Sequence, residues 1–278
     1  MKFARYDDGS SPRAGVLGED ERLHPLASGL TVEALIERGG LEALLTAGTD
    51  ALAAAPGPSA AAVRLLAPLL PASIRDSVSF EAHIEGARRS QEGATDPVPA
   101  RWYEAPCFYF TNPHACIGAR DDVQRFPGSE LFDLECEVGV VYGAHTLGPY
   151  LVTADELTPY RTPDGFLDLT MRAYINGELL GEDSLANMAW TFEELISFAS
   201  RGAAVAPGDL LASGTCHRGC LTEIWGRAGE RVPPPLVPGD VVTLEVEGLG
   251  TVRNRVIDAA PCPPIPPARR AQPRGPRH

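Results

Sequence analysis

Asp133-Leu134-Glu135-Cys136-Glu137-Val138-Gly139-Val140-Val141 is the most informative segment of this 278-residue chain. Side chains alternate between the two faces of a β-strand, so the three acids of this stretch are expected on one face. The valines that follow them predict a strand of the core, running from Phe132 to Val141. Carboxylates gathered on one face repel one another unless water or a cation lies between them.

A divalent cation is one explanation for Asp133, Glu135 and Glu137, and a solvated acidic face is the other. Ligands that are all carboxylates suit a hard ion, and Mg²⁺, Mn²⁺ and Ca²⁺ are the candidates. The spacing by itself leaves both explanations open.

Outside this stretch the sequence predicts a β-rich architecture with few helices. The chain holds 28 glycines and 26 prolines, which favour turns. Strands are expected at 171–175, 241–246 and 252–257. Asn176-Gly177 is typical of a tight hairpin turn, and Thr191-Phe192-Glu193-Glu194 is a capping box that begins a helix.

The chain divides into three parts by composition. Residues 1–71 are expected to form a small N-terminal domain, with a hairpin at 3–17 and a helix capped by Thr31 that Gly39-Gly40 weakens or breaks. Residues 72–260 are expected to form the main domain. Residues 261–278 are rich in proline and arginine and are expected to be disordered.

Charge and cysteine usage exclude several classes of function. A net charge of −13 argues against a nucleic-acid partner. The first residues do not resemble a signal peptide, no stretch has membrane-spanning length, and the six cysteines are scattered. Free thiols, a cytoplasmic location and no membrane partner are therefore expected. Cys216 and Cys220 lack a second pair at zinc-ligand spacing.

Several segments in the same order resemble the fumarylacetoacetate hydrolase family. The resemblance covers about residues 72–258, and residues before it resemble the small N-terminal domain of longer members. It implies an α+β, mostly β fold, a mixed β-sandwich or roll, in a homodimer that takes part in aromatic amino acid catabolism. The matching segments are 102–110, Asp133 to Gly143, 147–153, 174–179, 213–215 and 248–254.

The resemblance also implies a site. Metal ligands would be Asp76, Glu135 and Glu137; catalytic residues would be His83 and Glu223; substrate contacts would be Tyr109 and Thr215. Each residue also has a plain alternative. Asp76 and His83 could be a surface acid and a histidine at a helix start, Glu223 an exposed strand residue, and Tyr109 and Thr215 packing residues.

The chain departs from the family between Gly143 and Leu147. Family members carry an insertion of several tens of residues there, with a further aspartate ligand, a glutamine and a lysine near the leaving enolate. Here only Ala144-His145-Thr146 joins the flanking segments. Weaker ion binding and slower turnover are expected, because loss of one such donor typically costs about a hundredfold in rate. His145 could replace a ligand or belong to a plain surface loop.

Three readings of function remain. The first is a metal-dependent hydrolase that cleaves a C–C bond in a β-diketo acid such as fumarylacetoacetate or an acylpyruvate, with decarboxylation or isomerisation of an oxo-acid as a related reaction. The second is an inactive relative that serves as a binding or partner subunit. The third is an imperfect gene sequence across the short connection, which re-reading the coding DNA would reveal.

Overall fold

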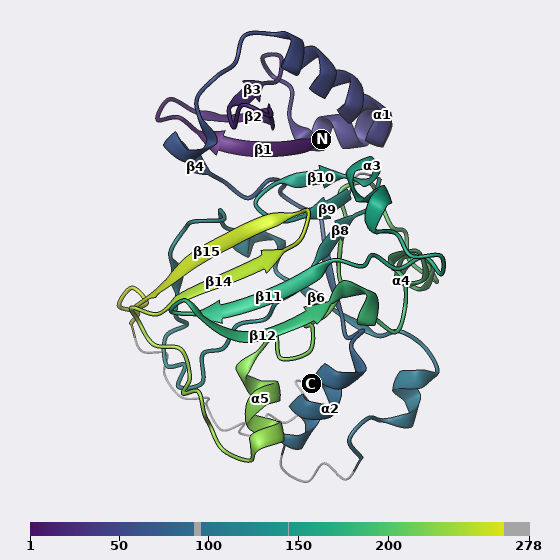
Figure 1. The fold of residues 1–278 in the computed structure, drawn as a ribbon, viewed down its shortest axis with the longest axis vertical. Coiled ribbons are helices and arrows are strands. Elements are labelled where there is room, and N and C mark those ends of the chain that lie inside the picture. Colours follow the sequence, from purple (N-terminus) through teal and green to yellow (C-terminus); the bar gives the residue numbers. More distant parts are fainter. Residues whose placement is uncertain (92–95, 144, 264–278) are drawn as a thin grey trace, which may run out of the picture.

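The computed structural model describes residues 1–91, 96–143 and 145–263, so most of the tail expected to be disordered lies outside the described residues. Within these residues the strands form two sheets, and the helices lie around them (Figure 1). Mixed sheets with few helices confirm the expected α+β class.

The larger sheet has ten strands within the described residues. Its order is β3 (Leu23–Pro25), β2 (Pro12–Leu17), β1 (Lys2–Asp7), β10 (Leu151–Thr153), β9 (His145–Leu147), β8 (Gly139–Val141), β13 (Leu210–Ala212), β5 (Ile74–Ser77) and β6 (Phe108–Thr111), with β4 (Arg64–Leu65) paired to β1. The pair β13–β5 is parallel, and the others are antiparallel.

The smaller sheet lies in front of the larger one in Figure 1. Its order is β12 (Glu178–Ser184), β11 (Thr170–Ile175), β14 (Val241–Val246), β15 (Gly250–Ile257) and β7 (Val123–Gln124). The α-helices are α1 (Val32–Ala53), α2 (Glu81–Arg89), α3 (Ala154–Leu157), α4 (Phe192–Ala199) and α5 (Leu221–Ala228). Short 3₁₀ turns are η1 (Ala60–Ala62), η2 (Ala100–Tyr103), η3 (Pro113–Ala115), η4 (Thr158–Tyr160) and η5 (Leu185–Asn187).

Strand β13 shows how two apolar cores share the larger sheet. Leu211 packs in a core with Met171 and Val246 of the smaller sheet. Its neighbours Leu210 and Ala212 point to the other face and pack with residues of the N-terminal part. A strand buried on both faces is apolar at every position, and this one reads Leu-Leu-Ala.

Most of the local predictions are confirmed. Thr31 caps α1, and Gly40 interrupts that helix with a φ of 55°. Asn176 and Gly177 join β11 to β12 with φ values of 54° and 85°, as a type I′ turn requires. Thr191 and Glu194 form the expected capping box of α4.

The prediction of a strand from Phe132 to Val141 is wrong over most of this range, because only Gly139–Val141 forms a strand. Residues 132–138 are not assigned to any strand, and several of their hydrogen bonds go to a loop. The Cys136 N–H donates to the Gly219 carbonyl at 3.0 Å, and the Cys216 N–H donates to the Cys136 carbonyl at 3.1 Å. The partner segment is irregular, so a regular ladder does not form.

The N-terminal part joins the larger sheet directly. Strand β1 pairs with β10 through Lys2 with Val152 and Phe3 with Leu151. The ribbon places this part, in purple, beyond β10 at one end of the molecule (Figure 1). Among the described residues, none of the helices has the length and apolar character needed to cross a bilayer.

Candidate active site

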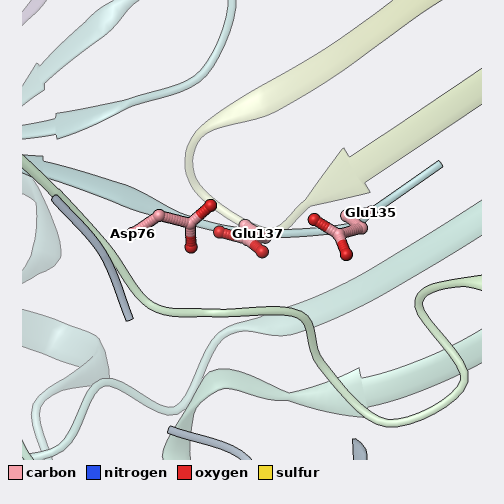
Figure 2. A group of neighbouring side chains, drawn as sticks. All are labelled: Asp76, Glu135 and Glu137. Carbon is pink, nitrogen blue, oxygen red and sulfur yellow. The ribbon is translucent and has the colours of Figure 1, made fainter. Parts of the chain in front are cut away.

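Three carboxylates from two separate segments meet beside the larger sheet. Asp76 lies on β5, whereas Glu135 and Glu137 lie on the extended segment before β8 (Figure 2). Strand β13 brings them together, since Ala212 pairs with Asp76 on one side and with Gly139 on the other. One oxygen from each carboxylate lies within 4.8 Å of the others. We call these three residues the acid cluster.

Alternation along the chain holds for Glu135 and Glu137 although the backbone is not a ladder strand. The residues between and beside them, Leu134, Cys136 and Val138, are buried in the core. Figure 2 shows the Glu137 carboxylate between those of Asp76 and Glu135. Asp133 is the exception, since it does not belong to the acid cluster.

The electrostatics of the acid cluster are unfavourable without a cation. Burial raises the pKa of Glu137 well above its usual range, and the negative charges of Asp76 and Glu135 raise it further. Partial burial and the charge of Asp76 also raise the pKa of Glu135, against an opposing effect of His83. A cation among the three carboxylates would offset this repulsion and favour the ionised forms of Glu135 and Glu137.

The oxygen separations fit a divalent cation. Two oxygens on opposite sides of Ca²⁺ lie about 4.6–5.2 Å apart, and on opposite sides of Mg²⁺ about 4.0–4.2 Å. Separations of no more than 4.8 Å are compatible with either ion.

Beside the acid cluster, His83 of α2 faces Glu223 of α5. The His83 Nδ1 lies 3.6 Å from the Glu223 Oε2. The two helices pack side by side (Figure 1). They approach closely because Gly86 and Gly226 have no side chains, and a β-carbon at Gly226 would overlap the Gly86 carbonyl.

Glu223 is fully buried and its carboxylate is well satisfied. His217 Nδ1 contacts its Oε1 at 2.6 Å, Arg227 Nε donates to the same oxygen at 3.0 Å, and the Arg218 N–H donates to Oε2 at 2.8 Å. Burial raises the pKa of Glu223, but the neighbouring His83, the Arg218 N–H, the charge of His217 and Arg227 outweigh that effect and lower it. The carboxylate is thus kept ionised beside two imidazoles.

These contacts correct one alternative and reveal one partner that sequence reasoning missed. Glu223 is neither exposed nor on a strand; it is the third residue of α5 and is 0% exposed. His217 was not predicted as a site residue. Its place two residues after Thr215, in a loop that reaches Glu223, was the available signal.

Tyr109 and Thr215 both lie against the acid cluster. Tyr109 is the cross-strand partner of Asp76 and is exposed. Partial burial of its hydroxyl, the hydrogen bond to Asp76 and the nearby acids raise its pKa. Thr215 is buried, and its hydroxyl donates to the Glu137 Oε1 at 3.0 Å. Its visible role is to orient Glu137.

Cys220 also lies near His83, with 3.7 Å between its Sγ and the His83 Nδ1. The thiol is buried, and desolvation raises its pKa. A thiol that stays protonated at neutral pH is a poor nucleophile. We therefore assign it no role in catalysis.

The strands on either side of the short connection pair with each other in antiparallel orientation. Strand β8 ends at Val141 and β9 begins at His145, with Val140 paired to Thr146. No other lysine is available to replace the one that the resemblance leads us to expect in the missing insertion, because Lys2 is the only lysine of the chain. Lys2 lies on β1 in the N-terminal part.

Comparison with solved structures shows the fold. The chain superposes on the fumarylacetoacetate hydrolase of psychrophilic Exiguobacterium antarcticum with a TM-score of 0.71 at 20% identity, covering 93% of this chain and 100% of that one. It superposes on the maleylpyruvate hydrolase of Sphingobium sp. SYK-6, solved with manganese(II) and pyruvate, with a TM-score of 0.65 at 20% identity, covering 94% and 100%.

Sequence comparison finds similarity in the C-terminal part of the chain. Residues 142–257 match the family described as fumarylacetoacetate (FAA) hydrolase C-terminal. A curated bifunctional isomerase/decarboxylase of 4-hydroxyphenylacetate degradation from Salmonella dublin is 30% identical over 115 residues, which is 41% of this chain and 22% of that protein. The chain therefore spans about a fifth of that relative. Over this range the chain is similar to the fumarylacetoacetate hydrolase family, and over most of its length it shares the fold of the two solved hydrolases.

The matched range does not contain the whole site. Thr215 and Glu223 fall within residues 142–257, whereas the acid cluster, His83 and Tyr109 precede it. The roles of those residues therefore depend on the geometry described above.

Proposed function

We propose that this chain holds a divalent cation at Asp76, Glu135 and Glu137 and cleaves a C–C bond in a small β-diketo acid of the fumarylacetoacetate or acylpyruvate type. The observation that carries the proposal is the acid cluster, with three carboxylates within 4.8 Å, lying beside the His83–Glu223 pair. Its surroundings raise the pKa of two of the three acids, which favours a bound cation over three bare charges.

When bound, a divalent cation in this site would supply Lewis-acid polarisation of the two oxygens of the enolised substrate. His83 is suited to take a proton from an attacking water, because a base of this kind needs an acidic partner behind it. Glu223 is that partner, and its lowered pKa keeps it anionic and able to stabilise the imidazolium.

The remaining residues orient this machinery. The buried Thr215 hydroxyl holds the Glu137 carboxylate, and Tyr109 presents an exposed phenol beside Asp76, where it can donate to a substrate oxygen. Its raised pKa keeps the phenol protonated and thus a donor.

Turnover is expected to be slow compared with relatives that carry the insertion. The hairpin between β8 and β9 leaves the enolate without the donors of the insertion, and each missing donor typically costs about 10²–10³ in rate. This expectation separates an impaired enzyme from an inactive binding subunit, which would bind the cation and show no turnover.

A second reaction is favoured by one relative. The Salmonella dublin protein is named as an isomerase/decarboxylase, and those reactions need no attacking water. We therefore keep oxo-acid decarboxylation or isomerisation as the alternative, in which Glu223 and His83 would move a proton on the substrate rather than activate water.

The experiment is to follow the enol absorbance of fumarylacetoacetate and acylpyruvates with purified protein and Mg²⁺, Mn²⁺ or Ca²⁺, with product analysis by NMR. Loss of absorbance with C–C cleavage products supports the proposal, and it should be abolished in Glu137→Gln. Evolution of CO₂ or an isomer supports the alternative. Cation binding without turnover on any oxo-acid supports a binding subunit and overturns the proposal.

We also propose a cytoplasmic homodimer. The homodimer follows from the resemblance to the family, and the cytoplasmic location from the free cysteines, which form no disulfide among the described residues. Light scattering on the eluted protein measures the oligomeric state, and a mass of one chain would refute the dimer.

A further inference from the structure

Asp133 does not belong to the acid cluster and instead holds the start of α5. Its Oδ1 accepts from the Leu221 N–H at 2.7 Å, and its Oδ2 accepts from the Thr222 N–H at 2.8 Å and from the Thr222 hydroxyl at 2.7 Å. The Leu134 N–H also donates to Oδ1 at 2.7 Å. One carboxylate therefore joins two segments 88 residues apart.

Helix α5 depends on this distant acid because its own cap is weak. The N-cap residue is Cys220, whose sulfur accepts from the Glu223 N–H at 3.3 Å. The other N–H groups of a first helical turn have no partner inside the helix. The Asp133 carboxylate accepts hydrogen bonds from two of these N–H groups. Its negative charge also interacts favourably with the positive end of the helix dipole.

The two ends of this contact are parts of the candidate active site. Asp133 is two residues before Glu135 of the acid cluster, and α5 carries Glu223 at its third position. We propose that Asp133 is a positioning residue that sets the distance between the acid cluster and the His83–Glu223 pair. This inference rests on the proposed function, since it assigns Asp133 to that same site.

The structure indicates which half of the site would move without Asp133. The segment of the acid cluster has other anchors, because the Val138 N–H donates to the Ser213 hydroxyl at 3.1 Å and Cys136 pairs with the loop of Gly219. Among the described residues, the first three backbone N–H groups of α5 have only Asp133 and the sulfur of Cys220 as acceptors, and the other polar contacts of this turn are those of the Glu223 side chain. Loss of Asp133 should therefore displace Glu223 from His83 and leave the acid cluster in place.

The test uses Asp133→Ala, Asp133→Asn and Thr222→Val in the full chain. Three quantities are measured: Mn²⁺ affinity by calorimetry, kcat and KM on the best oxo-acid, and the ¹⁵N signals of the His83 ring. We expect Asp133→Ala to change Mn²⁺ affinity and KM by less than about threefold and to lower kcat about 10–100-fold. Its His83 signals should approach those of Glu223→Gln.

The other variants should change kcat and the His83 signals by smaller amounts. Asn keeps one acceptor oxygen, so Asp133→Asn should fall between wild type and Asp133→Ala. Thr222→Val removes one of four donors and should shift the His83 signals in the same direction by less. Thr31→Ala is the matched control, since it removes the cap of α1 and should lower Tm by about 2–4 °C without changing any of the three quantities.

Two outcomes would overturn the inference. Unchanged kcat and His83 signals beside a lower Tm would make Asp133 a purely structural cap. Equal losses of Mn²⁺ affinity and kcat would make it part of the acid cluster. If the wild type turns over no oxo-acid, the proposed function fails by itself, and the Mn²⁺ and His83 measurements still decide the role of Asp133.

Discussion

Gly86 on α2 lies directly against Glu223 on α5, so closely that a β-carbon at position 86 would overlap the Glu223 Cγ. The Arg227 Nε would lie 2.9 Å from the same β-carbon. The absence of a side chain at Gly86 is thus a condition for the His83–Glu223 contact, because any larger residue must separate the two helices.

Gly86→Ala should therefore lower turnover while leaving the cation site intact. We expect kcat to fall at least about tenfold because His83 loses its partner, and stability to fall by about 1–3 kcal/mol from overpacking. Steady-state kinetics and urea unfolding measure the two effects. Gly39→Ala on α1 is the control, since its β-carbon would meet only the Ala43 Cβ, at 3.2 Å. Unchanged kcat in Gly86→Ala would show that the pair tolerates separation.

Glu137→Gln should remove the thermal response to cations. A ligand at about 100 times its Kd stabilises the folded state by about 2.7 kcal/mol, which is about 5–10 °C in Tm for a chain of this size. We expect wild type to show a shift of this order with Mn²⁺ and Glu137→Gln to lose most of it. Without cation the variant should be no less stable, because a repelling charge is gone. Glu178→Gln, exposed on β12, is the control.

His83→Gln and His217→Gln should differ in effect although both rings reach Glu223. His83 also influences Glu135, whereas His217 lies 36% exposed on the other side of the carboxylate. We expect His83→Gln to lower kcat by about 10²–10⁴, as loss of a general base does, and His217→Gln by less than about tenfold. Kinetics at saturating cation measure both, with exposed His114→Gln as control. Equal losses would mean that His217 takes part in proton transfer.

Asp209→Asn should reveal a buried ion pair with a defined pH dependence. The Asp209 Oδ2 lies 3.1 Å from the Arg75 Nη1, and both residues are buried. Burial raises the pKa of Asp209, but the Ala206 N–H, Ser73 and Arg75 outweigh it and hold the pKa below its ordinary value of 3.8. Loss of one partner of such a pair costs about 3–5 kcal/mol.

The sign of the pH effect follows from the lowered pKa. The folded state binds the proton less tightly than the unfolded state, so the stabilisation by Asp209 is complete above pH 3.8 and is lost as the pH falls through the lower folded value. Urea unfolding of wild type and Asp209→Asn should show a constant difference above that pH and a narrowing one below it. Asp50→Asn, at an exposed position of α1, is the control.

The sequence predicted elements that depend on neighbouring residues. The type I′ turn at Asn176-Gly177, the capping box at Thr191 and the kink of α1 at Gly40 each follow from a few adjacent side chains, and all are present. The strand at 132–138 failed because a strand needs a regular partner, and alternation in one segment does not reveal its partner.

In the candidate site, too, features set by neighbouring residues were predicted, and features set by distant partners were not. Alternation correctly placed Glu135 and Glu137 on one side, and the order of family motifs supplied Asp76, which β13 brings alongside. The capping role of Asp133 was beyond prediction because its partner α5 lies 88 residues away. His217 had a signal in its place after Thr215, but its contact with Glu223 depends on how the loop folds back on α5. Nothing in a run of alternating acids tells a ligand from a helix cap.

The pairing of β1 with β10 limits how the chain can be shortened. Removing residues 1–71 would strip β10 of a neighbour and leave an unpaired edge, and Val141 and Leu151, which now pack beneath the N-terminal part, would face water. Such a fragment is more prone to self-association than to independent folding. A shortened version of this chain for crystallisation should therefore retain β1.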